Sequence, residues 1–271
     1  MAVVAEQVSI YGTEVRLRKA GVGPDLLFLH GAGGGDQWFP VYDQIAEAFT
    51  LYAPLHPGWG DTWMPDWLEG IDDLVFHYAS FIEDLALQKP VLFGTSLGGW
   101  IAVELAIYRP DLVSALVLVD PAGFRPENPD WQLDIFNEAP QELFAKLFAD
   151  PAKAMAMRPP PEGATIDLMV GQYRGSAALA RLMWRRNYDP KLRLRAARIK
   201  APCAVFWGAQ DQLFTLEHGK TVARDIPGAE LVVIDNAGHV PYLEQPEAFL
   251  RAFWAFVKKH NLATTAANLK R

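Results

Sequence analysis

The sequence has little cysteine and no excess of positive charge. Its single cysteine, Cys203, excludes an internal disulfide and a cysteine-based metal cluster. The 271 residues carry a formal net charge of −7, which argues against nucleic acid as a partner of the whole chain. Hydrophobic residues make up 51% of the chain and charged residues 21%, a composition typical of globular proteins.

Two further absences concern membranes and export. No apolar run is long enough to cross a bilayer, so we predict no membrane span. Residues 1–10 lack the basic start and the long apolar run of a secretory signal. Together these absences lead us to expect a cytoplasmic protein. The length allows one large domain with an insertion, or two small domains.

The hydrophobic pattern that is present is that of an α/β protein. Short apolar runs rich in β-branched residues alternate with longer segments of helical period, which is typical of βαβ units on a parallel sheet. Alternating polar and apolar residues predict an antiparallel hairpin at the sheet edge, at 4–10 and 13–19. Continuous apolar runs predict buried strands at 25–30, 50–55, 90–94, 112–120, 203–208 and 230–235. Helices are predicted at 38–48, 97–109, 216–225 and 246–260.

Two features add detail to this alternation. Asp72 or Asp73 is predicted to cap the helix that follows it. Residues 121–200 interrupt the pattern, since they contain many prolines, several helical stretches and no convincing strand. We therefore predict a mostly parallel, doubly wound α/β core formed by residues 1–120 and 201–271. Residues 121–200, called the inserted segment below, are predicted to be mostly helical.

The pentapeptide Gly-Thr-Ser-Leu-Gly at residues 94–98 lies between a predicted strand and a predicted helix. A sharp turn of this kind exposes its serine, Ser96, at a helix N-terminus, where the helix dipole favours negative charge. The flanking glycines allow neighbouring backbone to approach closely. Taken alone, the motif fits a packing or capping serine as well as a nucleophile.

A glycine-rich loop follows the strand predicted at 25–30. Stabilising an oxyanion takes two backbone N–H groups, one from the residue after the nucleophile and one from such a loop. Leu97 supplies the first donor, and we predict Ala32 as the second, with Gly33 as the next candidate. A phosphate-binding loop is the competing interpretation, but the Gly-Lys-Ser/Thr ending of such loops is missing.

A nucleophilic serine also needs a base and an acid that orients the base. His239 and Asp211 each follow a predicted strand, so both are expected at the carboxyl edge of the sheet with the serine. Asp120 ends another predicted strand and is the alternative acid. Of the other histidines, His30 is expected to hydrogen-bond the backbone of the glycine-rich loop, and His218 to face solvent.

Five motifs appear in an order that resembles the α/β-hydrolase superfamily, and the resemblance covers nearly the whole chain. They read LHGAGGG, HPGWG, GTSLGG, WGAQDQLF and NAGHVPYLEQPE. The resemblance implies a Ser96–His239–Asp211 triad, an acyl-enzyme and no metal or cofactor. It also implies that the inserted segment is a helical cap. The GAQD sequence matches the family's usual position for the acid, which favours Asp211 over Asp120.

Substrate preference rests on weaker signals. Eleven aromatic residues in the loops and the inserted segment predict a hydrophobic, small-molecule substrate. Most of them are nevertheless expected to pack the cap against the core. They are Trp38, Phe39, Trp59, Trp63, Trp67, Trp131, Phe136, Phe144, Phe148, Trp184 and Tyr188. Trp38, Trp184 and Val240 are our candidate substrate contacts. The inserted segment has 13 basic and 9 acidic residues, so Arg185 or Arg186 is a candidate to bind a substrate carboxylate.

Three functions fit these observations. The first is a carboxylesterase acting on a small to medium hydrophobic ester. The second is a carbon–carbon bond hydrolase of aromatic ring-cleavage products, enzymes that usually carry an aromatic residue after the histidine where this chain has Val240. The third is a ligand receptor with the same fold. Thioester, amide and lactone substrates stay open, as does the oligomeric state, for which a homodimer is one option.

Overall fold

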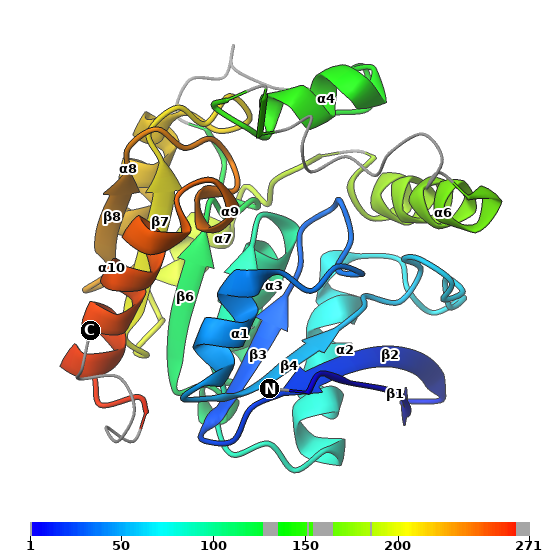
Figure 1. Cartoon of the computed structure of the whole chain (residues 1–271), viewed down its shortest axis with the longest axis horizontal. Helices are drawn as coiled ribbons and strands as arrows, with labels where there is room; N and C mark the ends of the chain where they lie inside the picture. Colours follow the sequence, from blue (N-terminus) through cyan, green and yellow to red (C-terminus); the bar gives the residue numbers. More distant parts are fainter. Residues whose placement is uncertain (1, 127–134, 151, 154–164, 185, 264–271) are drawn as a thin grey trace.

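The computed structural model describes residues 2–126, 135–150, 152–153, 165–184 and 186–263. Eight strands form one sheet in the order β1-β2-β4-β3-β5-β6-β7-β8 (Figure 1). β2 runs antiparallel to both of its neighbours, and every other pair of neighbours is parallel. The strands are β1 (Val4–Ile10), β2 (Thr13–Ala20), β3 (Asp25–Leu29), β4 (Thr50–Pro54), β5 (Val91–Thr95), β6 (Ala115–Val119), β7 (Cys203–Gly208) and β8 (Glu230–Ile234).

The central strands are buried along their whole length. β5, β6 and β7 have no exposed residue, because both faces of the sheet are covered and continuous apolar runs can fill both sides. β1 lies at the edge and is mostly exposed, as the hairpin prediction requires. The predicted doubly wound, mostly parallel sheet is therefore confirmed.

Helices cover the two faces of the sheet in separate layers. α2 (Ile71–Asp84), α3 (Leu97–Tyr108), α7 (Leu192–Ala196) and α8 (Leu216–Asp225) contribute to one hydrophobic core. α1 (Pro40–Ala46), α9 (Pro241–Glu244) and α10 (Pro246–Lys259) contribute to the other. A short 3-10 helix (Pro110–Leu112) follows α3, which ends one residue before the predicted end at residue 109.

Two local predictions are resolved by side-chain contacts. The prediction that Asp72 or Asp73 caps α2 is wrong, because the N-cap is Gly70; Asp73 lies in the first turn, where its carboxylate accepts the N–H groups of Glu69 (2.8 Å) and Gly70 (2.9 Å). The prediction that His218 faces solvent is wrong. Its side chain is on the inner face of α8, where the whole residue is 4% exposed.

The inserted segment contributes α4 (Pro140–Lys146), α6 (Ile166–Met183) and α7. In Figure 1, α4 and α6 lie beyond the carboxyl ends of the central strands. Its described residues form no strand, only an isolated bridge between Gly123 and Tyr188. α7 packs against α3 and α8, with Leu192 and Ala196 fully buried. Within the described residues, no helix has the length and apolarity needed to cross a bilayer.

Candidate active site

Ser96 occupies a strained turn between β5 and α3. Its backbone angles are φ 51° and ψ −114°, in a region that residues with a side chain rarely adopt. Three hydrogen bonds hold the turn. The Ser96 N–H donates to the carbonyl of Val119 (2.9 Å), and the Ser96 carbonyl accepts from the N–H groups of Trp100 (3.1 Å) and Ala122 (2.9 Å). Because β6 fixes the turn, the Ser96 side chain is presented at a defined place on the sheet edge.

The glycines of the motif are required by close backbone contacts. A Cβ atom on Gly98 would lie 2.0 Å from the carbonyl oxygen of Leu29, and one on Gly94 would lie 2.4 Å from that of Gly98. α3 therefore starts in direct contact with β3 and β5. A Cβ on Gly31 would lie 3.2 Å from Cβ of Ser96, which places the glycine-rich loop against the serine.

Two buried histidines hold the glycine-rich loop. His30 Nδ1 donates to the carbonyl of Gly31 (2.7 Å), and its Nε2 accepts the N–H of His56 (2.9 Å). His56 Nε2 donates to the carbonyl of His30 (2.8 Å), and its Nδ1 accepts from Tyr78. Burial lowers the pKa of His30 to about 4, and burial together with His30 lowers the pKa of His56. Both rings are thus neutral at pH 7, and the predicted backbone role of His30 is confirmed.

The peptides of this loop are held from both sides. The carbonyl of Gly31 accepts from His30 and from the N–H of Gly34 (3.1 Å). Because a trans peptide points its N–H opposite to its carbonyl, these bonds also orient the N–H of Ala32. The carbonyl of Ala32 accepts the indole N–H of Trp59 (2.9 Å), which orients the next N–H, that of Gly33.

Asp211 and His239 form a buried pair on the loops that follow β7 and β8. His239 Nδ1 donates to Asp211 Oδ2 (2.8 Å). Asp211 Oδ1 accepts the N–H groups of Leu213 (2.7 Å) and Phe214 (3.0 Å), so both carboxylate oxygens are used. His239 is 2% exposed, and its Nε2 has no hydrogen-bond partner among the described residues. Nε2 is therefore the nitrogen left to accept a proton.

Asp120 lies beside this pair without bonding the histidine. Its Oδ1 accepts the N–H of Gly208 (3.1 Å), and its backbone is left-handed, with φ 42°. A ligand atom from each of Asp120, Asp211 and His239 lies within 4.8 Å of the others. Burial, and next the charge of Asp211, raise the pKa of Asp120 well above its usual value, so this carboxyl stays protonated over a wider range. The His239 ring thus donates its Nδ1 hydrogen bond to Asp211 and not to Asp120.

The three groups could in principle ligate a cation. However, hydrogen bonds already use both carboxylate oxygens of Asp211, Nδ1 of His239 and one oxygen of Asp120.

Ser96 is close to the same cluster, since its N–H is bonded to Val119, the residue before Asp120. The structure therefore brings the predicted serine, acid and base to one edge of the sheet.

The predicted aromatic contacts are mostly packing residues where the structure describes them. The Trp38 indole donates to Asp43 (2.9 Å) and packs edge-on against Tyr42 in α1. Trp59 is 2% exposed and supports the glycine-rich loop. A Cβ on Gly175 of α6 would lie 2.8 Å from the Trp59 ring, so the inserted segment rests on this indole.

The remaining candidates lie apart from one another. Trp184 follows α6, is 73% exposed and has its ring 5.6 Å from that of Phe136. Val240 is half-buried, precedes α9 and packs against the second core. Arg185 and Trp131 lie outside the described residues. A substrate contact by any of these side chains stays a prediction.

Sequence reasoning missed one buried residue next to the histidine. Glu244 is 3% exposed, and its Oε2 accepts the N–H of Gly238 (2.6 Å). The His239 N–H donates to the carbonyl of Leu147 in the inserted segment (2.9 Å). The only available signal was a single charge within the otherwise apolar stretch that follows His239.

Comparison with known proteins identifies the family of this chain. Residues 26–252 match the model of the alpha/beta hydrolase family. The chain belongs to this family. The match runs from the start of β3 to α10, so it leaves out β1 and β2 but contains the Ser96 turn, the inserted segment and the loops of Asp211 and His239.

Named relatives of this alpha/beta hydrolase have different substrates. It is 26% identical to 2-hydroxy-6-oxo-6-(2'-aminophenyl)hexa-2,4-dienoic acid hydrolase from Metapseudomonas resinovorans, over 98% of this chain and 95% of that protein. It is also 26% identical to pimeloyl-(acyl-carrier protein) methyl ester esterase from Aeromonas salmonicida, over 90% and 99%. The solved meta-cleavage product hydrolase from Pseudomonas fluorescens superposes with a TM-score of 0.77 at 20% identity, over 94% and 97%, and shows the fold alone. These likenesses support hydrolase activity in general.

Proposed function

We propose that this alpha/beta hydrolase is a serine carboxylesterase that cleaves a small to medium hydrophobic ester. The observation that carries the proposal is the buried Asp211–His239 hydrogen bond, which leaves Nε2 without a partner among the described residues at the same sheet edge as the strained Ser96. The Ser96 hydroxyl attacks the ester carbonyl while His239 Nε2 takes its proton. Asp211 keeps the proton on Nδ1 and stabilises the imidazolium that forms.

Two backbone donors stabilise the tetrahedral intermediate in this mechanism. They are the N–H of Leu97 and the N–H of Ala32, with Gly33 as the alternative to Ala32. Each donor is worth roughly 3–4 kcal/mol of transition-state stabilisation. The hydrogen bonds that orient the loop peptides support this role, because a donor that is already oriented costs no reorganisation during the reaction.

The second half of the reaction uses the same groups. His239 returns its proton to the leaving alcohol, and a water molecule then attacks the acyl-Ser96 ester with His239 again as the base. The products are a carboxylic acid and an alcohol, and the serine is regenerated. We assign the inserted segment the role of a helical cap on the core of residues 1–120 and 201–271, in keeping with the position of α4 and α6 beyond the strand ends.

Carbon–carbon bond hydrolysis is the second candidate. The likeness to the hydrolase from Metapseudomonas resinovorans favours it, because that match covers 98% of this chain. Val240 argues for the ester, since an aromatic residue is expected at that position in carbon–carbon hydrolases. The esterase from Aeromonas salmonicida offers a comparable likeness, so the substrate has to be decided by assay.

The test compares two substrates and two serine variants. We expect the protein to release a burst of p-nitrophenol from a short-chain ester, and Ser96→Ala to abolish it. Ser114→Ala is the matched control, because Ser114 precedes β6 at the opposite edge of the sheet. A fluorophosphonate should label the wild type and the control but not Ser96→Ala.

Three other outcomes change the conclusion. Preferred cleavage of a vinylogous 1,5-diketone transfers the assignment to carbon–carbon hydrolysis. Labelling of Ser96 without turnover of either substrate favours a receptor with the same fold. Failure of the fluorophosphonate to label Ser96 overturns the nucleophile itself.

A further inference from the structure

A buried carboxylate joins the inserted segment to the loop of His239. We propose that Glu244 is a positioning residue that, through this joint, sets the place of His239 for catalysis. The proposal rests on the proposed function, in which His239 is the base. Residues 147–150 of the inserted segment are called the anchor turn below. In this proposal the anchor turn is a fixed support of His239.

Within the residues that the structure describes, the Glu244 carboxylate accepts hydrogen bonds from backbone N–H groups alone. Its Oε1 accepts from Ala149 (3.1 Å) and Asp150 (3.2 Å) of the anchor turn. Its Oε2 accepts from Gly238 (2.6 Å) and also from Ala149 (3.1 Å). One side chain therefore bonds both the anchor turn and the residue immediately before His239.

Direct backbone contact tightens the same joint. The His239 N–H donates to the carbonyl of Leu147 (2.9 Å). A Cβ on Gly238 would lie 2.8 Å from both the Leu147 oxygen and the Ala149 nitrogen, so the two backbones touch. Two segments that approach this closely cannot shift independently.

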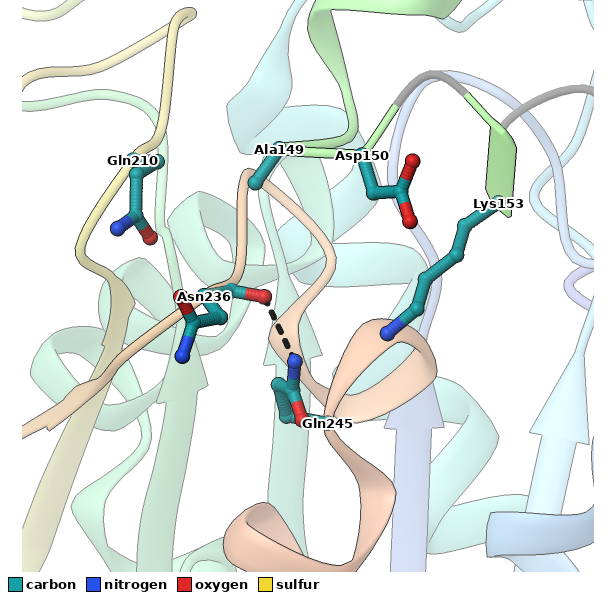
Figure 2. Close-up of a pocket in the computed structure, with 6 residues that line it drawn as sticks. All are labelled: Ala149, Asp150, Lys153, Gln210, Asn236 and Gln245. Atoms are coloured by element: carbon teal, nitrogen blue, oxygen red, sulfur yellow. Dashed lines mark hydrogen bonds between the residues drawn. The ribbon is translucent and has the colours of Figure 1, made fainter.

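The outer surface of the joint is polar. Figure 2 shows Ala149, Asp150 and Lys153 of the inserted segment facing the loop that carries Asn236 and Gln245. Lys153 Nζ donates to the backbone carbonyl of Glu244 (2.5 Å), which is a second link between the segments. Gln245 Nε2 closes the loop by donating to the carbonyl of Asn236 (2.8 Å).

The chemistry of this joint makes the carboxylate hard to replace. Charge-assisted hydrogen bonds from a carboxylate to N–H groups are about twice as strong as neutral ones. Glu244 forms no salt bridge with any cation in the described part of the chain, so the N–H groups stabilise its charge. Removing the carboxylate leaves the buried N–H of Gly238 and the partly buried N–H groups of the anchor turn without this acceptor, which favours separation of the two segments. His239 would move with its loop, away from the geometry set by Asp211.

The decisive variant is Glu244→Gln. The amide has the same shape but only one acceptor oxygen, so its NH₂ group must face the N–H of either Gly238 or Asp150, and the joint loosens while the side chain still fills its space. We expect kcat on the p-nitrophenyl ester to fall about 10–100-fold with KM changed less than about threefold, since small misplacements of a reacting group cost rates of this size. Glu247→Gln is the control, because Glu247 is exposed in the first turn of α10.

A spectroscopic readout separates positioning from stability. The proton that His239 Nδ1 shares with Asp211 should give a downfield ¹H NMR signal, and Glu244→Gln should move or broaden it. A folded Glu244→Gln variant with unchanged kcat and an unchanged signal overturns the proposal. Loss of thermal stability with normal kcat at low temperature also overturns it, because that result assigns Glu244 a structural role only.

A second variant covers the case in which changes at Glu244 prevent folding. Lys153→Met removes the outer link and leaves the carboxylate in place, and it should lower kcat severalfold and broaden the same signal. An unchanged kcat and signal in Lys153→Met then overturn the coupling. If Ser96→Ala keeps full activity, the proposed function fails, yet the NMR signal of His239 still decides whether Glu244 positions it.

Discussion

The two loops beside Ser96 are held by groups of opposite character. The glycine-rich loop is supported by buried polar side chains that are neutral at pH 7, namely His30, His56, Tyr78 and Trp59. The loop of His239 is supported by two buried carboxyl side chains, those of Asp211 and Glu244, with the carboxyl of Asp120 beside them.

This difference matches the charges that develop in the proposed reaction. Negative charge appears on the substrate oxygen near the glycine-rich loop, and positive charge appears on the imidazole of His239. Neutral supports on one side avoid repelling the oxyanion, whereas the Asp211 carboxylate on the other stabilises the imidazolium. Both effects are strong because the groups are buried, where charges are screened less than in water. The site is thus polarised before substrate arrives.

Neutralising the acidic side should have the largest effect. We expect Asp211→Asn to lower kcat on the p-nitrophenyl ester by about 10⁴-fold, as loss of the acid does in serine proteases. The amide preserves size but has one acceptor oxygen, so when that oxygen accepts the N–H groups of Leu213 and Phe214 its NH₂ group faces Nδ1 and moves the histidine proton to Nε2. Steady-state kinetics on the folded variant gives the measurement.

Asp120 supplies the control for this variant. Without the Asp211 charge beside it, Asp120 ionises more readily, because that charge is one cause of its raised pKa. The double variant Asp120→Asn/Asp211→Asn should therefore have a lower kcat than Asp211→Asn alone. A near-normal rate in Asp211→Asn would instead make Asp120 the acid.

The buried histidines near the glycine-rich loop should make the free energy of unfolding decrease at acidic pH. Burial lowers the pKa of His77, which packs edge-on against Tyr78, to about 4. The unfolded chain, with a histidine pKa near 6.5, takes up a proton first as pH falls. The contribution of His77 to the free energy of unfolding is therefore constant above pH 6.5, and it decreases by about 3 kcal/mol as the pH falls towards 4.

His77→Phe tests this expectation. Neither ring nitrogen of His77 has a hydrogen-bond partner among the described residues, so phenylalanine loses no bond and keeps the packing against Trp67. Urea denaturation at pH 4.5 and pH 7 should show a smaller loss of stability in His77→Phe than in the wild type. Equal losses in both proteins would place the acid sensitivity elsewhere.

The amino-acid sequence predicts the Ser96 turn and the strands around it better than it predicts the groups that support the His239 loop. Strands β5 to β8 and the Ser96 turn follow from apolar runs and glycines, whereas the choice of Asp211 as the partner of His239 follows from the resemblance to the α/β-hydrolase superfamily. Glu244 could not be found this way, because its partners are backbone N–H groups up to 95 residues away. Backbone groups are the same in every residue, so no pattern marks them. His218 failed for a related reason, since a ten-residue helix leaves the inner face ambiguous until Trp207 and Phe214 are placed.

Removing one neutral support should give the smallest effect. Trp59→Phe keeps the ring that α6 rests on but loses the indole N–H that binds the Ala32 carbonyl, so kcat should fall severalfold, in keeping with about 1 kcal/mol for one neutral hydrogen bond. KM should stay nearly constant, because the loop acts on the intermediate. Trp254→Phe is the matched control, since Trp254 stacks on Phe49 in the opposite helix layer. A loss in Trp59→Phe as large as that in Asp211→Asn would show that rigidity of the loop, rather than the contrast in charge, governs the rate.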